Sequence, residues 1–127
     1  MSDAHTTIED LKLRVRQFSQ VRDWEQFHNP KDLALALVCE IGEVLEHFRY
    51  QTNDQIRDKL NSPPEHTALA HELADCLWLL LRIADVTGVD LASSLREKLV
   101  LADLKYPVDK VHGKPHKYTA YLTDQTE

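Results

Sequence analysis

The chain has 127 residues, three glycines, five prolines and a formal net charge of −6. This length fits one compact domain, and the shortage of turn-forming residues disfavours an all-β fold. The negative charge disfavours nucleic acid or an anionic membrane as the main partner, and the lack of a long apolar run or a signal-peptide pattern predicts a soluble, cytoplasmic protein.

The first half of the chain carries two helical patterns. Thr6 and Glu9 fit a capping box at the start of a helix, and apolar residues then recur at helical spacing to about residue 22. Asn29 followed by Pro30 is typical of a helix start, because asparagine caps the first turn and proline is tolerated there. We expect this second helix to run from about Pro30 to Arg49.

The second half of the chain carries two more helical patterns. Residues 50–62 are polar and are predicted to form a loop that holds a short helical turn. Ser62 precedes two prolines and starts a long third helix, which Gly88 ends because glycine readily adopts the left-handed C-cap conformation. Asp90 caps a fourth helix that reaches about Tyr106. The residues beyond it are expected to be irregular, with the final few disordered.

These patterns predict an all-α fold with a subunit of the four-helix-bundle type. We expect a single domain over residues 1–127, with its core at about residues 6–107 and an irregular tail at residues 108–127. The third helix is apolar almost all round and therefore needs burial on every side. Since four helices cannot easily enclose it, we expect a homo-oligomer with this helix near the subunit interface. Trp78, in the middle of this helix, is interpreted as core or interface packing.

Two matched pairs of acidic residues lie within the apolar stretches. Glu40 and Glu43 belong to C-E-I-G-E, and Glu72 and Asp75 belong to H-E-L-A-D. The i, i+3 spacing places both carboxylates of a pair on one helix face, with Cβ atoms roughly 5–6 Å apart. Like charges held that close beside a core favour a bound cation or raised pKa values. Mg²⁺ is the leading candidate because it takes oxygen ligands and usually also holds substrate phosphates.

Helical phase places both acidic pairs on the same side of the apolar stripe of their helices. If the second and third helices pack antiparallel, their acidic edges would meet, either within one subunit or across a subunit interface. The alternative is that all four acids lie on a solvated face. A transition-metal site of the di-iron type is disfavoured, because neither acidic helix carries the E-x-x-H pair of such sites.

Three segments carry a resemblance to a known family: R-D-W-E-Q-F-H-N-P (22–30), L-A-L-V-C-E-I-G-E-V-L-E-H-F (35–48) and K-Y-P-V-D-K (105–110). The chain resembles the all-α NTP pyrophosphatases of the MazG type, and more specifically their dCTP pyrophosphatase branch, over about residues 8–118. The resemblance implies a Mg²⁺-dependent hydrolase that cleaves a nucleoside triphosphate, with dCTP or a modified dCTP favoured, into the monophosphate and pyrophosphate. It also implies nucleotide-pool house-cleaning and a homotetramer, arranged as a dimer of dimers, or a dimer.

The resemblance assigns roles to individual residues by position. The metal ligands and catalytic residues would be Glu40, Glu43, Glu72 and Asp75. Residues at the base pocket would be Trp24 and Tyr50, with Phe18 and His28 nearby. Residues near the phosphates would be Lys98, Lys105 and Tyr106. Tyr50 stands where the animal enzymes have Trp, and Leu79 replaces a polar or aromatic pocket residue of those enzymes.

The basic tail and two rival functions stay open. The lysines and histidines of residues 108–118 would either close over bound phosphates as a flap or form a solvated tail. The first rival function is a helical-bundle module that binds nucleotides or regulates without turnover. The second is an enzyme for dUTP or another triphosphate.

Overall fold

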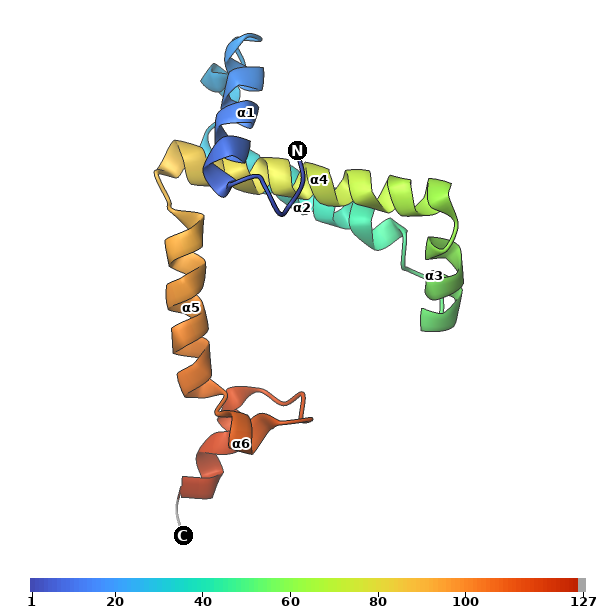
Figure 1. Ribbon diagram of the computed structural model, residues 1–127, viewed down its shortest axis with the longest axis vertical. Coiled ribbons are helices and arrows are strands. Elements are labelled where there is room, and N and C mark those ends of the chain that lie inside the picture. The colour runs from blue at the N-terminus through green and yellow to red at the C-terminus, as the bar shows by residue number, and fades with distance from the viewer. Residues whose placement is uncertain (126–127) are drawn as a thin grey trace. The chain divides into compact units, whose positions relative to one another are not determined.

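The computed structural model describes residues 1–125, which are helical with turns and loops and contain no strand (Figure 1). The all-α prediction is confirmed. The α-helices are α1 (Ile8–Gln20), α2 (Pro30–Glu46), α3 (Asn53–Leu60), α4 (Pro63–Thr87), α5 (Leu91–Lys105) and α6 (Val108–Val111). Two 3₁₀ helices, η1 (Glu25–Phe27) and η2 (Tyr118–Gln125), complete the described elements. None of the helices within residues 1–125 combines the length and apolarity needed to cross a membrane.

The chain falls into two compact units, Met1–Val89 and Asp90–Glu127. In the first unit, α2 and α4 lie side by side and run in opposite directions, and α1 and α3 pack on α4 (Figure 1). The second unit consists of α5, α6 and η2. The single domain expected over residues 1–127 stays a prediction.

Most predicted helix boundaries agree with the structure to within a few residues. The Asn29 side chain accepts a hydrogen bond of 2.9 Å from the Asp32 N–H at the start of α2. Gly88, with φ of 70°, ends α4 in the left-handed conformation. The Asp90 side chain accepts a 2.8 Å bond from the Ser93 N–H and caps α5. These caps satisfy backbone groups that the helix itself leaves unpaired, so short polar residues at the right place fix where a helix begins.

The capping box of α1 differs from the expected one by one residue. The Thr7 hydroxyl oxygen accepts a bond of 3.1 Å from the Asp10 N–H, and the Asp10 carboxylate accepts one of 3.0 Å from the Thr7 N–H. Thr6 and Glu9 have the same i, i+3 spacing but do not form the box. The Asp10 side chain is long enough to reach back to the cap, and the choice of Thr7 as cap starts α1 at Ile8.

Three further boundaries correct the sequence analysis. The second helix ends at Glu46 rather than at Arg49. The polar segment at residues 50–62 contains a full helix, α3, rather than a loop with a short helical turn, because Thr52 and Gln55 form a capping box at its start. The tail is not wholly irregular, since it forms α6 after Pro107 and then η2. The expected disorder of the final few residues falls partly on residues 126–127, outside the described part of the chain.

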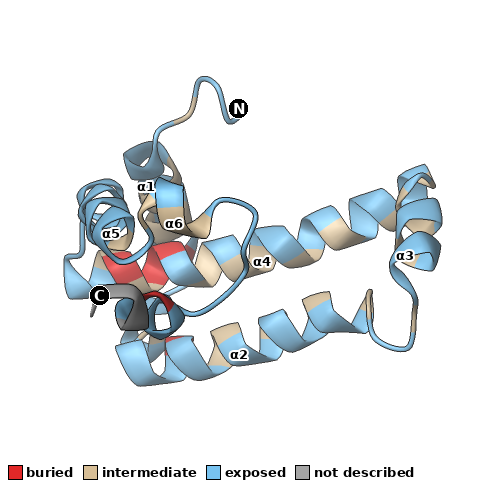
Figure 2. Cartoon of the chain, turned by 90° about the horizontal axis from the view of Figure 1, so that it is seen from below, coloured by how far each residue is buried: buried red, intermediate tan, exposed pale blue. Residues whose placement is uncertain are grey.

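The core of the first unit lies where α1 meets α4, and Figure 2 shows the buried residues of this region in red. The buried side chains of this unit are Ser19 on α1, Leu33 on α2, and Leu81, Arg82 and Ala84 on α4. Apolar burial there provides the main stabilising contribution. A buried arginine at this place is unusual, because charged residues are almost never fully buried unless paired.

Most of the apolar stripe of α2 faces the interior of the unit, because Leu33 is buried and Leu37 and Val44 are half-buried. On α2, Leu37 and Glu40 are half-buried, whereas Ile41 is 54% exposed. On α4, Glu72 is half-buried and Leu73 is 51% exposed. The acidic edges therefore lie at the contact between the helices, and part of each apolar stripe is left uncovered within one chain.

Candidate active site

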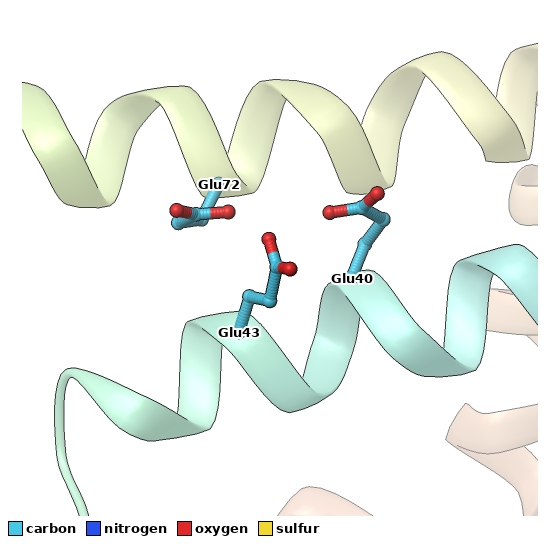
Figure 3. Close-up of side chains that lie close together, drawn as sticks. All are labelled: Glu40, Glu43 and Glu72. Atoms are coloured by element: carbon cyan, nitrogen blue, oxygen red, sulfur yellow. The ribbon is translucent and has the colours of Figure 1, made fainter.

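Three glutamate side chains converge between α2 and α4. Glu40 and Glu43 project from α2 and Glu72 projects from α4 into the space between the helices (Figure 3). One carboxylate oxygen from each lies within 4.8 Å of the others. The two α2 residues share a face because of their i, i+3 spacing, and the antiparallel course of α4 brings Glu72 opposite them.

The cluster is electrostatically strained in the absence of a cation. Burial raises the pKa of Glu40, and the neighbouring carboxylate of Glu43 raises it further. Burial also raises the pKa of Glu72, again helped by Glu43. Oxygen Oε2 of Glu40 is buried and has no hydrogen-bond partner among the described residues. Unpaired buried oxygens are uncommon in folded proteins, and a hard divalent cation would satisfy this one and relieve the repulsion. The donor set therefore fits such a cation.

Asp75, the fourth acid of the sequence analysis, lies at the edge of this cluster. It is not one of the three residues whose oxygens meet. Its negative charge nevertheless raises the pKa values of both Glu40 and Glu72. Asp75 also lines a cavity that adjoins the glutamates through Glu40.

The adjoining cavity has a volume of about 220 Å³ and combines aromatic walls with polar groups. Its lining residues are Trp24, His28, Ala36, Glu40, Asp75, Trp78, Leu79 and Arg82. Cavities that enclose a drug-sized ligand are usually ~300–1,000 Å³, so this one suits a single heterocyclic ring rather than a whole nucleotide. A ring bound here would lie next to the carboxylate cluster.

Phe18 on α1 contacts the two tryptophans that line the cavity, Trp24 before α2 and Trp78 on α4. The ring of Phe18 lies edge-on to Trp78 with centroids 4.9 Å apart and to Trp24 with centroids 5.9 Å apart. Such edge-to-face pairs hold the rings in fixed orientations. The guanidinium of Arg22 covers the Phe18 ring at 3.6 Å. Phe18 thus supports both tryptophans, and Trp24 and His28 line the same cavity, while the role of the three residues at a base stays a prediction.

Sequence reasoning missed two cavity residues on α4. Trp78 was interpreted as core or interface packing, but it lines the cavity. Arg82 also lines the cavity, and within L-W-L-L-L-R-I-A-D it is a charged residue in an apolar run. Both follow Asp75 at helical spacing, at i+3 and i+7, and this spacing is the signal that could have found them.

Arg82 is part of a charged network at the base of the cavity. Its side chain is 1% exposed and pairs with Asp85 at 2.5 Å, while Arg16 also donates to Asp85. The hydrogen bonds from Arg16 are the main reason why the pKa of Asp85 is lowered. Arg82 also donates from Nε to Nδ1 of His28 at 3.2 Å. This network ties α1 and the loop before α2 to α4.

Tyr50 is not brought to Trp24 within one chain. Trp24 precedes α2, whereas Tyr50 follows it, so the 17 residues of α2, about 25 Å, separate the two ends. Tyr50 is 93% exposed and has a φ of 62°, and the guanidinium of Arg49 lies 5.1 Å from its ring. A base pocket that contains both aromatic rings would therefore need Tyr50 from a second copy of the chain.

The predicted phosphate-binding residues belong to the second unit. Lys98 and Lys105 lie on α5, and Tyr106 caps its end. Together with Tyr118 they line a cavity of their own, in which Tyr106 and Tyr118 lie edge-on at 6.4 Å. The Lys105 ammonium lies 4.9 Å from the Tyr118 ring. Their role at the phosphates stays a prediction.

Known proteins resemble this chain in sequence over most of its length. No family model matches it. However, it is 39% identical over 113 residues to dCTP pyrophosphatase 1 of Bos taurus, covering 89% of this chain and 67% of that protein. The chain belongs to the dCTP pyrophosphatase family. The human protein of the same name is 38% identical over 113 residues, covering 89% of this chain and 66% of that protein. The chain thus spans about two thirds of the length of these relatives.

Structural similarity agrees with this family. A crystal structure of a pyrophosphatase from Archaeoglobus fulgidus superposes with a TM-score of 0.74 and 29% identity, covering 84% of this chain and 98% of that one. The predicted family, the all-α pyrophosphatase fold and the enzyme class, a nucleotide pyrophosphohydrolase, are confirmed. The glutamate cluster between α2 and α4 could hold the divalent metal that such an enzyme suggests.

Proposed function

We propose that this member of the dCTP pyrophosphatase family hydrolyses deoxynucleoside triphosphates, with dCTP or a modified dCTP preferred, to the monophosphate and pyrophosphate. One observation carries the proposal: three glutamates converge beside a small aromatic cavity, so that a metal-bound triphosphate and a stacked base fit next to each other. The relatives named dCTP pyrophosphatase support the choice of substrate.

The metal of the proposed site is Mg²⁺, held by Glu40, Glu43 and Glu72 with Asp75 at the edge. Mg²⁺ prefers oxygen ligands and supplies charge neutralisation for the phosphate oxygens when it is bound. In phosphoryl transfer the protein contributes mainly position and electrostatic stabilisation. The carboxylates here would orient the attacking water, and one oxygen that is not used for metal would accept its proton.

The base would occupy the cavity between the aromatic rings. Stacking of a base on an aromatic ring contributes about 1–3 kcal/mol in single-strand binding sites, and Trp24 and Trp78 offer such surfaces here. The relatives named dCTP pyrophosphatase are the reason to prefer dCTP over dUTP.

The proposed enzyme works as a homo-oligomer, either a dimer or a tetramer. Apolar side chains on α2 and α4 that one chain leaves uncovered, such as Ile41 and Leu73, favour association. A second copy would also supply Tyr50 to the base.

Lys98, Lys105 and Tyr106 would contact the phosphates. The cell would use the activity to remove unwanted nucleotides in the cytoplasm.

Release of pyrophosphate tests this function directly. The purified chain would be incubated with Mg²⁺ and dCTP, dUTP, dTTP, dATP or dGTP, and monophosphate and pyrophosphate would be quantified. We expect the highest kcat/KM for dCTP, and we expect no product from any of these nucleotides in EDTA. A binding module without turnover would retain nucleotide and give no product. Equal rates for dCTP and dUTP would refute the proposed preference for dCTP.

A further inference from the structure

Arg82 connects the cavity to the charged network beneath it. Its Nε donates to Nδ1 of His28 at 3.2 Å, one terminal nitrogen pairs with Asp85 at 2.5 Å, and the other lies 3.8 Å from Glu25. The side chain is 1% exposed, so these groups, rather than water, fix its orientation. Arg82 and His28 both line the cavity, together with Trp24 and Trp78.

The direction of the hydrogen bond determines the protonation of His28. A guanidinium has donors and no acceptor, and it stays protonated in proteins, so Nδ1 of His28 must offer a lone pair. In a neutral imidazole the other nitrogen then carries the proton, which leaves Nε2–H as the donor of the ring. Burial lowers the pKa of His28, and the positive charge of Arg82 lowers it further, so the ring is neutral at pH 7.

We propose that Arg82 is a positioning residue that fixes His28 as a hydrogen-bond donor toward a carbonyl oxygen of the bound pyrimidine. The inference rests on the proposed function, because it takes a nucleobase as the occupant of the cavity. The opposite tautomer would point a lone pair of Nε2 at that oxygen, and two acceptors repel each other. Arg82 thus acts on the substrate through His28, whereas Trp24 and Trp78 contact the base themselves.

A purely structural role for Arg82 makes a different prediction, and the chain offers a matched control. Arg16 also donates to Asp85, but it makes no hydrogen bond to His28 among the described residues. If Arg82 only neutralised Asp85, removal of either guanidinium would affect substrate binding in the same way. If Arg82 sets the tautomer of His28, only its own removal would weaken binding of the base.

Steady-state kinetics of Arg82→Leu and Arg16→Leu separate these roles. Loss of one hydrogen bond to the base should raise KM for dCTP about three- to tenfold in Arg82→Leu, with kcat within about twofold of wild type. Arg16→Leu should leave KM within about twofold of the wild-type value. An equal rise of KM in both variants, or no rise in either, would overturn the positioning role.

The tautomer itself can be read in the wild-type protein, so the test does not depend on whether a variant folds. Two-dimensional ¹⁵N NMR of the histidine ring at pH 7 should show Nδ1 of His28 without a proton and Nε2 with one. A proton on Nδ1 would refute the inference. Absence of dCTP turnover in wild type would reject the proposed function instead. In that case the NMR result and the dCTP affinities of the two variants still decide the role of Arg82.

Discussion

Replacing Glu43 by glutamine removes one of the three like charges that meet between α2 and α4, and it should stabilise the metal-free protein. Oxygens of Glu40 and Glu43 lie within 4.8 Å of each other. Even with the full dielectric screening of water, two unit charges at that distance repel by about 1 kcal/mol. Since Glu43 is exposed and salt screens it further, we take about 1 kcal/mol as the expected gain. For a chain of this size it corresponds to a rise in Tm of about 2–5 °C.

Mg²⁺ should reverse the order of stability of the two proteins. A ligand that binds only the folded state stabilises it by RT ln(1 + [L]/Kd), which is about 1.4 kcal/mol at ten times Kd. Wild type should gain at least that much in excess Mg²⁺, whereas Glu43→Gln should gain little and should lose pyrophosphate release from dCTP. Stability and activity would then change in opposite directions, as expected when a site is built for a cation.

Thermal unfolding followed by circular dichroism, in EDTA and in Mg²⁺ at low ionic strength, measures both effects. Glu46→Gln is the matched control, because Glu46 lies on the same helix but is paired with Arg49 at 2.9 Å, away from the cluster. Its Tm should change by less than that of Glu43→Gln and should not depend on Mg²⁺. A lower Tm of Glu43→Gln in EDTA, or a wild-type Tm that is indifferent to Mg²⁺, would refute the reasoning.

Four further predictions concern titration, base stacking and core packing. Folding raises the pKa values of Glu40 and Glu72, so ionisation of these groups opposes folding. In EDTA, the free energy of unfolding should therefore rise as the pH falls through these folded pKa values. Saturating Mg²⁺ should abolish this rise. The pKa of Asp85 is lowered on folding, so its ionised carboxylate stabilises the protein above its unfolded pKa, and this stabilisation is lost as the pH falls through its folded pKa. Unfolding in urea between pH 7 and pH 3 would show both trends. A free energy of unfolding that only decreases with falling pH in EDTA would contradict the prediction for Glu40 and Glu72. Trp24→Ala should raise KM for dCTP about five- to hundredfold and Trp24→Phe much less, measured by pyrophosphate release; equal effects would argue against stacking. Leu81→Ala should destabilise the protein by about 2–5 kcal/mol in urea unfolding, because Leu81 is 2% exposed in the core; a loss under 1 kcal/mol would place the core elsewhere.

Helix ends could be predicted from the sequence because capping is local chemistry. Asn29, Gly88 and Asp90 each act on backbone groups a few residues away, and each marks a boundary that the structure reproduces. The error at Thr6 has the same origin, since two neighbouring threonines each have an acid three residues later and local spacing cannot choose between them. The i, i+3 spacing of the acids was equally local, and it placed Glu40 and Glu43 correctly on one face.

The exposed part of the apolar stripes could not be predicted in this way. The acidic edges meet as expected for antiparallel helices, and Leu33 and Leu37 are buried or half-buried, but Ile41 and Leu73 are exposed. Periodicity finds the face that avoids water, but it does not say whether the same chain or another one covers it. A helix at a subunit interface buries one face within its own chain and another against a second copy. In this chain, the acidic edges lie on the face that α2 and α4 bury against each other.

Under the proposed function, the face of α4 that closes on α2 carries groups for both ends of a nucleotide in order. Glu72 and Asp75 come first, Trp78 and Leu79 follow one turn later, and Arg82 lies one turn beyond. At 1.5 Å per residue, the step from Glu72 to Arg82 covers about 15 Å along the helix. Phosphates held at the carboxylates would therefore direct the base toward Trp78 and Arg82 without any rearrangement of α4. Because one rigid helix sets both positions, a substitution that bends α4 between them should impair metal-dependent hydrolysis and base selection together.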